Sequence, residues 1–96
     1  MFVLVTYDVS TTTADGRRRL ARAAKACKDF GQRAQNSVFE CQVDTTQFAQ
    51  LKQRLLDIID LEQDSLRFYF LGANWRRRVE HHGVNLTLDL DGPLVC

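Results

Sequence analysis

The strongest constraint on the fold of this chain is the order in which its hydrophobic pattern changes period. Apolar residues at every second position are typical of strands, whereas apolar residues at helical spacing are typical of helices that face a core. These patterns predict, in chain order, a strand at 2–9, a helix at 15–30, a hairpin at 32–43, a helix at 45–61 and a strand at 65–71. The order β-α-β-β-α-β predicts an α+β, ferredoxin-like sandwich, in which two helices cover one face of a four-stranded antiparallel sheet.

Local features support these boundaries. Gly31 is the expected end of the first helix, and the dipeptide Asn36-Ser37 supplies polar turn formers between the two strands of the hairpin. Asp44 precedes the second helix and is a candidate N-cap. The first strand is apolar in both of its alternating sets, which predicts a central strand that is covered on both faces.

The sheet face that the helices leave open is expected to carry Tyr7, Val9, Phe39 and Tyr69. A domain of this size rarely exposes a contiguous apolar surface of that kind. A second sheet from an identical chain is the simplest cover, so we predict a homodimer that forms through stacked sheets.

The chain has 96 residues, which suits a single domain over residues 1–96. Residues 76–96 are expected to form a C-terminal extension. The extension contains two candidate strands, 84–90 and 93–96, separated by a turn, and we expect it to add a strand to an edge of the sheet, within reach of the partner.

Composition excludes several classes of protein. No apolar run approaches the roughly 20 residues that span a bilayer, and no signal peptide precedes the first strand, so we expect a cytoplasmic protein without membrane contact. The three cysteines are widely spaced and form no C-x-x-C pair, which argues against a disulfide framework and against a structural zinc site.

Charge is unevenly distributed, although the formal net charge is only +1. Residues 15–36 contain seven basic and two acidic residues, whereas residues 44–64 contain five acidic and two basic ones. This asymmetry predicts a polyanion bound on one face of the domain. The residues that we expect to contact nucleic-acid phosphates are Arg17, Arg18, Arg22, Arg33, Arg76, Arg77 and Arg78. A solvated helix face explains the first-helix arginines equally well.

Asp8 brings a carboxylate to the end of the hydrophobic first strand. It is either a cap for the backbone of Ser10 or Thr11 or a functional group, and the pattern favours neither. If two sheets stack in a dimer, the two Asp8 carboxylates can approach each other across the twofold axis, where their repulsion favours a hard cation between them. Mg²⁺, for which Mn²⁺ would substitute, accepts carboxylates and waters as ligands and can activate a phosphodiester for hydrolysis.

Other groups are weaker candidates for catalysis. His81 and His82 are adjacent, so their side chains diverge, and we expect both to face solvent. The cysteines lack the nearby histidine and asparagine of a thiol nucleophile, and no glycine-rich phosphate loop is present. Asp8 is therefore the predicted catalytic and metal-binding residue.

Three segments resemble a known family. "VLVTYDVS" (3–10) and "GQRAQNSVFEC" (31–41) look like the two hallmark segments of the CRISPR-associated protein 2 family, the small metal-dependent nucleases of bacterial adaptive immunity. "YFLGANWRRRVEHHG" (69–83) resembles the members found with subtype I-C systems. Ser37 and Phe39 match positions of the family pattern, and we expect Phe39 to be chiefly a packing residue.

The resemblance implies a ferredoxin-like homodimer in which Asp8 of both subunits coordinates magnesium. It also implies a partner, the larger CRISPR-associated integrase (protein 1 of the series), with which the dimer forms the spacer-acquisition complex and holds duplex DNA by backbone contacts. Two functions then compete. The first is an endonuclease that cuts RNA or double-stranded DNA, and the second is a DNA-binding scaffold that does not need Asp8 for acquisition. A toxin-type ribonuclease of similar fold is a third, weaker alternative.

Overall fold

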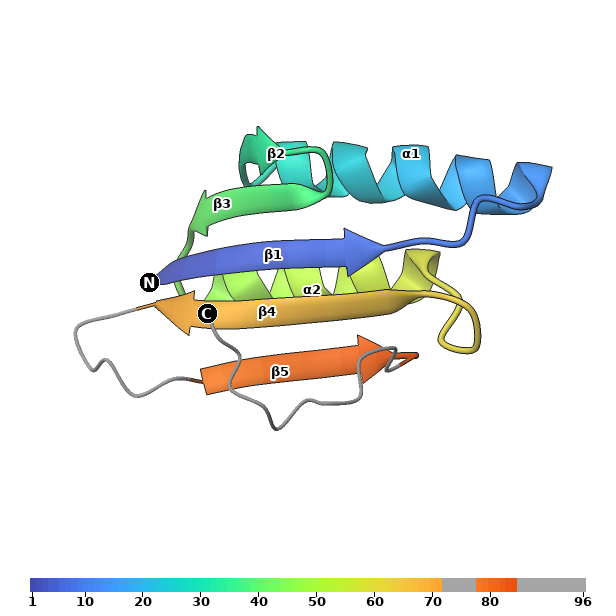
Figure 1. Ribbon diagram of the computed structural model, residues 1–96. Coiled ribbons are helices and arrows are strands. Elements are labelled where there is room, and N and C mark those ends of the chain that lie inside the picture. Colours follow the sequence, from blue (N-terminus) through green and yellow to red (C-terminus); the bar gives the residue numbers. More distant parts are fainter. Residues whose placement is uncertain (72–77, 85–96) are drawn as a thin grey trace.

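The structure, a computed structural model, describes residues 1–71 and 78–84 and has the expected order of elements with one further strand (Figure 1). The elements are β1 (Phe2–Asp8), α1 (Ala14–Lys28), β2 (Gly31–Gln35), β3 (Val38–Gln42), α2 (Thr45–Ile58), β4 (Ser65–Leu71) and β5 (Arg78–Gly83). The strands form one sheet in the order β2-β3-β1-β4-β5, and every neighbouring pair is antiparallel. The predicted ferredoxin-like α+β fold is therefore confirmed.

The added edge strand begins earlier than predicted. β5 occupies residues 78–83, whereas the predicted candidate strands are 84–90 and 93–96. Apart from Val84, both segments lie outside the described residues. The sequence pattern does not predict this strand, because both of its alternating sets contain polar residues, as in Glu80-His81-His82. Neither set therefore forms an apolar face.

Each helix begins with an N-cap residue whose side chain accepts a backbone hydrogen bond. Thr13 accepts a hydrogen bond from the Gly16 amide at the start of α1 (3.1 Å). Asp44 and Gln47 form a reciprocal capping box at the start of α2, with distances of 2.7 and 2.9 Å. The predicted cap at Asp44 is confirmed.

The sequence predicts that Gly31 ends α1, but Gly31 is instead the first residue of β2. The C-cap of α1 is Asp29, and a Cβ at Gly31 would lie 2.2 Å from the Glu40 carbonyl oxygen of β3. Glycine is therefore required here for close approach between two strands. The predicted hairpin around Asn36-Ser37 is confirmed.

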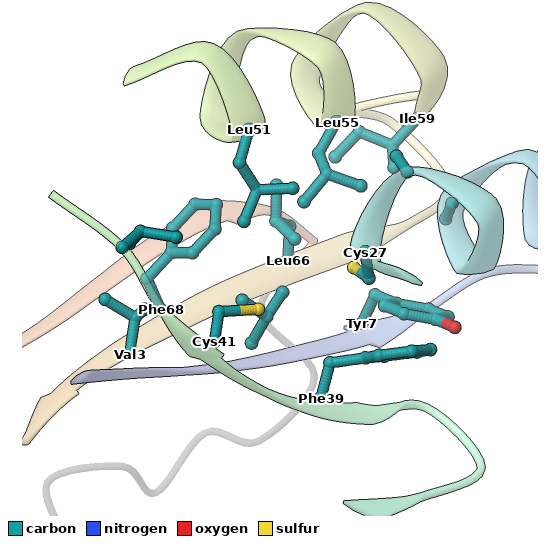
Figure 2. Close-up of a cluster of buried hydrophobic side chains, with 14 of the residues drawn as sticks. Val3, Tyr7, Cys27, Phe39, Cys41, Leu51, Leu55, Ile59, Leu66 and Phe68 are labelled. Carbon is teal, nitrogen blue, oxygen red and sulfur yellow. The ribbon is translucent and has the colours of Figure 1, made fainter. Parts of the chain in front are cut away.

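Both helices pack on the same face of the sheet, and the hydrophobic core lies between the two layers (Figures 1 and 2). α2 contributes Leu51, Leu55 and Ile59 from its C-cap, while α1 contributes Cys27. The strands supply the opposite side of the core: Val3, Val5 and Tyr7 from β1, Phe39 and Cys41 from β3, and Leu66 and Phe68 from β4. Phe39 is fully buried, so its predicted packing role is confirmed.

The composition of the open sheet face differs from the prediction. Tyr7, Val9 and Phe39 were expected there, but all three belong to the buried core beneath the helices. Both alternating sets of β1 are apolar, so the pattern alone does not reveal which set meets the helices. Residues on the open face include Leu4, which pairs with Tyr69, and Tyr69 pairs in turn with Val79. Val79 is 47% exposed and Leu71 43%, so this face still carries an apolar surface.

Among the described residues, no helix has both the length and the apolar character that crossing a membrane requires.

Candidate active site and nucleic-acid interface

Asp8 is the last residue of β1 and lies at the carboxyl end of the central strand, as predicted (Figure 1). It pairs with Ser65 of β4. Since side chains alternate along a strand, Asp8 shares the open face with Leu4 and Thr6, while Tyr7 points to the helices. Its side chain is exposed, so the structure presents a solvent-accessible carboxylate at this end of the sheet.

The loop that follows Asp8 is held by another acid. The Ser10 amide donates to Asp64 Oδ1 at 3.0 Å, so the capping alternative considered for Asp8 at Ser10 is wrong. Asp64 lies just before β4 and is fully buried. Its Oδ2 accepts hydrogen bonds from Arg19 Nε and from the Asp60 amide, each at 2.8 Å. Arg19 Nη2 donates to Oδ1 at 3.2 Å.

Asp64 therefore ties three segments together: the loop after β1, helix α1 and the turn after α2. Burial alone would raise the pKa of the Asp64 carboxyl, but the bonds from Arg19, Asp60 and Ser10 outweigh burial and hold that pKa below its usual value. In the sequence, Asp64 is only one of the five acidic residues of 44–64, and this role is not predicted. The local pattern carries no signal for it, because its partner Arg19 is 45 residues away.

Asp8 is the carboxylate that the described part of one chain offers to the predicted metal site. Within 1–71 and 78–84, no three histidine, cysteine or acidic residues cluster closely enough to hold a metal ion. Mg²⁺ nevertheless needs few protein ligands, since it often binds through one or two carboxylates and retains several waters. The exposed Asp8 oxygens fit that chemistry, and a second copy of the chain would supply the second carboxylate.

Four of the predicted phosphate-contacting arginines form two groups on the helix-bearing side of the domain: Arg17 with Arg33, and Arg18 with Arg22. Arg17 and Arg33 line one open pocket of about 430 Å³ between α1 and the β2–β3 turn, together with Tyr7 and Ser37. The Arg33 guanidinium lies over the Phe39 ring, 5.2 Å from its centroid. Burial raises the pKa of the Tyr7 hydroxyl, and the nearby Arg33 opposes that rise. The Arg33 guanidinium is thus positioned beside the apolar surface of the Phe39 ring.

Arg18 and Arg22 line a separate groove between α1 and α2. Arg18 forms an ion pair with Asp15, whereas Arg22 has no ion pair among the described residues. Arg76 and Arg77 lie outside the described residues, and Arg78 begins β5. The structure thus does not gather the predicted arginines into one surface, and it places the helix arginines away from the open face that carries Asp8.

The two histidines diverge as predicted, but the expectation that both face solvent is wrong. Both are half-buried and have defined partners. His81 Nδ1 accepts a hydrogen bond from Arg67 Nε at 3.0 Å. His82 Nε2 contacts a carboxylate oxygen of Glu80 at 2.9 Å and lies against the Phe68 ring.

Comparison with known proteins identifies the family. Residues 1–79 match the sequence model of the family described as CRISPR associated protein Cas2. The chain belongs to the Cas2 family. It is 59% identical over 95 residues to the CRISPR-associated endoribonuclease Cas2 of Nitratidesulfovibrio vulgaris, an alignment that covers 99% of this chain and 93% of that protein. A CRISPR-associated endonuclease Cas2 from Halalkalibacterium halodurans is 54% identical over 95 residues, covering 99% of each chain.

Solved structures agree with this assignment. The crystal structure of Streptococcus pyogenes Cas2 superposes with a TM-score of 0.71 at 59% identity, covering 79% of this chain and 92% of that chain. A hypothetical protein from Thermus thermophilus superposes with a TM-score of 0.66 at 33% identity, covering 75% and 82% of the two chains. The Cas2 fold is therefore present here, with Asp8 at the end of its first strand.

Proposed function

We propose that this Cas2 chain is a magnesium-dependent endonuclease that hydrolyses phosphodiester bonds of RNA or double-stranded DNA during CRISPR spacer acquisition. The observation that carries the proposal is the exposed Asp8 carboxylate at the end of a central strand, in a chain closely similar to proteins named CRISPR-associated endoribonuclease or endonuclease. The similarity of residues 69–83 to subtype I-C members favours a system of that subtype.

The working unit in this proposal is a homodimer. The open face exposes apolar side chains along β1, β4 and β5, and a second sheet of the same kind would bury them. Stacking in this way also supplies the second Asp8 carboxylate that a shared metal ion needs.

In the proposed site, Asp8 holds Mg²⁺, or Mn²⁺ in its place. When bound, such an ion polarises a phosphodiester and lowers the pKa of a water molecule. Asp8 fixes the position of this chemistry, because it is the last residue of β1, which is hydrogen-bonded to β3 on one side and to β4 on the other. The hydrogen bond from the Ser10 amide to Asp64 fixes the loop that follows Asp8.

A second function, a DNA-binding scaffold that joins the subunits of the CRISPR-associated integrase, has separate support. Arg17, Arg22 and Arg33 lie on the helix-bearing side, so they can contact a duplex backbone without any contribution from Asp8. Both functions can reside in one molecule, because they use opposite faces.

Substitution of Asp8 separates the two functions. We expect Asp8→Ala to abolish magnesium-dependent cleavage of labelled RNA and duplex DNA while the protein stays folded. Glu40→Gln is the matched control, because Glu40 is an exposed acid on the same sheet face and its loss removes the same charge. Cleavage by Asp8→Ala at the wild-type rate would exclude Asp8 from catalysis, and unimpaired spacer acquisition by an inactive Asp8→Ala protein would favour the scaffold.

A further inference from the structure

The pocket between α1 and the β2–β3 turn carries positive charge without a neighbouring carboxylate. Among the described residues that line it, the charged ones are Arg17 and Arg33. The groove between α1 and α2 differs, because Asp15 and Asp57 lie among its basic residues. An anion in the first pocket therefore meets two cations and no acidic side chain.

Neither of these two charges is neutralised. Within residues 1–71 and 78–84, neither arginine forms an ion pair. Arg17 Nη1 donates to the carbonyl oxygen of Thr11 at 3.4 Å, which is a neutral acceptor. Arg33 pairs with Phe39 across the hairpin, and its guanidinium lies over the ring. This stacking leaves the N–H groups at the edge of the guanidinium plane available to a ligand.

One wall of the pocket is an apolar strip of α1. Leu20, Ala21 and Ala24 lie three, four and seven residues after Arg17, so all four residues share one face of the helix. Leu20 and Ala24 pack against the core and are partly buried. The pocket therefore offers an apolar surface directly beside its charges.

The opposite wall, the turn at Asn36 and Ser37, is fixed to the central strand. The Tyr7 amide donates to the Ser37 carbonyl oxygen at 3.2 Å. The Tyr7 ring stacks on that of Phe39, with centroids 6.2 Å apart and an angle of 21° between the planes (Figure 2). Both walls are thus held by the folded core, and the pocket exists before any ligand enters.

Charge and size together select the ligand. A phosphate monoester carries about −1.5 to −2 at neutral pH, which matches two guanidinium groups, whereas a phosphodiester carries one negative charge. Each guanidinium can also donate two parallel hydrogen bonds to phosphate oxygens. The volume of about 430 Å³ lies within the range of small-molecule sites, and a duplex cannot enter it. The apolar wall suits a sugar and a base.

We propose that this pocket binds one nucleotide through its terminal phosphate monoester, with Arg17 and Arg33 as the phosphate-binding residues. A free mononucleotide and the 5′ end of a strand share this chemistry. The choice of a nucleotide among phosphate monoesters rests on the proposed role in nucleic-acid processing, whereas the phosphate contact does not. The pocket lies on the helix-bearing side, away from the sheet face that carries Asp8.

Calorimetric titration of thymidine 5′-monophosphate into the full-length protein, in EDTA, tests the phosphate contact without cleavage. We expect Arg17→Gln and Arg33→Gln each to weaken binding about tenfold or more, because charge-assisted hydrogen bonds are lost. Thymidine, which lacks the phosphate, should bind at least about tenfold more weakly than the nucleotide. Lys25→Gln is the matched control. It removes the same charge from the same helix but lines the α1–α2 groove, and should change the affinity by less than about twofold.

A substitution that leaves the charge unchanged tests the pocket itself. Ala21 is exposed on α1, so Ala21→Phe should fill the pocket while the protein stays folded, as circular dichroism would verify. We expect this variant to lose about tenfold or more in nucleotide affinity. Wild-type affinity in folded Ala21→Phe would overturn the inference, because it would show that the nucleotide binds elsewhere.

Two further probes identify the source of the phosphate. They are single-stranded thymidine octanucleotides that end in a 5′-phosphate or in a 5′-hydroxyl. Tighter binding of the phosphorylated strand than of the free nucleotide would assign the pocket to strand ends, whereas equal or weaker binding would assign it to a free nucleotide. Either result supports the inference if the affinity depends on Arg33.

The remaining outcomes separate this inference from the proposed function. It would be overturned by equal affinities for nucleotide and thymidine, by equal losses in Lys25→Gln and Arg33→Gln, or by no measurable binding of any phosphorylated probe. Arg33-dependent binding of duplex DNA that ignores a terminal phosphate would also overturn it, by assigning the arginines to the backbone. An absence of cleavage by the wild-type protein, with nucleotide affinity that depends on Arg33, would refute the nuclease function and leave the pocket standing.

Discussion

Replacement of Asp64 by asparagine should destabilise the protein more than a change of one atom suggests. Each carboxylate oxygen of Asp64 accepts two hydrogen bonds, one from Arg19 and one from a backbone amide. Asparagine retains one oxygen and turns an NH₂ group toward the other two donors. Whichever orientation the amide takes, one bond from Arg19 is lost and one buried amide loses its acceptor.

The magnitude follows from these losses. A hydrogen bond to a charged group contributes about 1.5–3 kcal/mol, and an unsatisfied buried donor costs about 1–3 kcal/mol. The expected loss is therefore about 3–5 kcal/mol, which agrees with the cost of breaking a buried ion pair by removing one charge. Little solvent is available to compensate, because the Asp64 side chain is fully buried and that of Arg19 is 13% exposed.

Urea denaturation followed by far-UV circular dichroism, at fixed protein concentration, measures this loss as a change in the free energy of unfolding. Asp57→Asn is the control, because Asp57 is an exposed acid of α2 whose carboxylate accepts from the Gln53 side chain, and its replacement should change that free energy by no more than about 0.5 kcal/mol. A loss below about 1 kcal/mol in Asp64→Asn would refute the view that this carboxylate organises the end of the sheet.

Four other predictions test separate features. Because the folded-state pKa of Asp64 is lowered, its contribution to stability is present above the unfolded pKa of about 4 and is lost as pH falls through the folded value, so acid titration of unfolding should show a smaller loss in Asp64→Asn than in wild type. Gly83→Ala should cost about 1–3 kcal/mol in denaturation, owing to the positive φ and the close Asp64 carbonyl; unchanged stability would contradict this geometry. Burial raises the pKa of Cys27 to about 12 and that of Cys41 to about 11, so neither thiol should react with iodoacetamide at pH 8 in the folded protein, and peptide mass spectrometry that finds either alkylated would disprove their burial. Tyr69→Glu places a charge in the middle of the open face and should convert the proposed dimer to monomer in sedimentation experiments; an intact dimer would place the interface elsewhere.

Local patterns in the sequence determine the order of elements, the hairpin and the cap of the second helix. Apolar spacing reports the period of each segment, Asn36-Ser37 suits a turn, and Asp44 lies three residues before Gln47 as a capping box requires. These interactions join residues a few positions apart, so their geometry follows from the residues themselves. The position of Asp8 at the end of a strand was predictable for the same reason.

Only the tertiary structure decides which surfaces and partners these elements present. The sequence pattern predicts Tyr7 and Phe39 on the open face. Strand pairing instead aligns Tyr7 with Leu66, and Val5 with both Phe39 and Phe68, and the helices cover this set. The partnership of Asp64 with Arg19 and that of Arg67 with His81 likewise appear only once strands and helices are assembled. The physical reason is that period is a property of a single segment, whereas burial and charge pairing depend on register between segments that lie tens of residues apart in the chain.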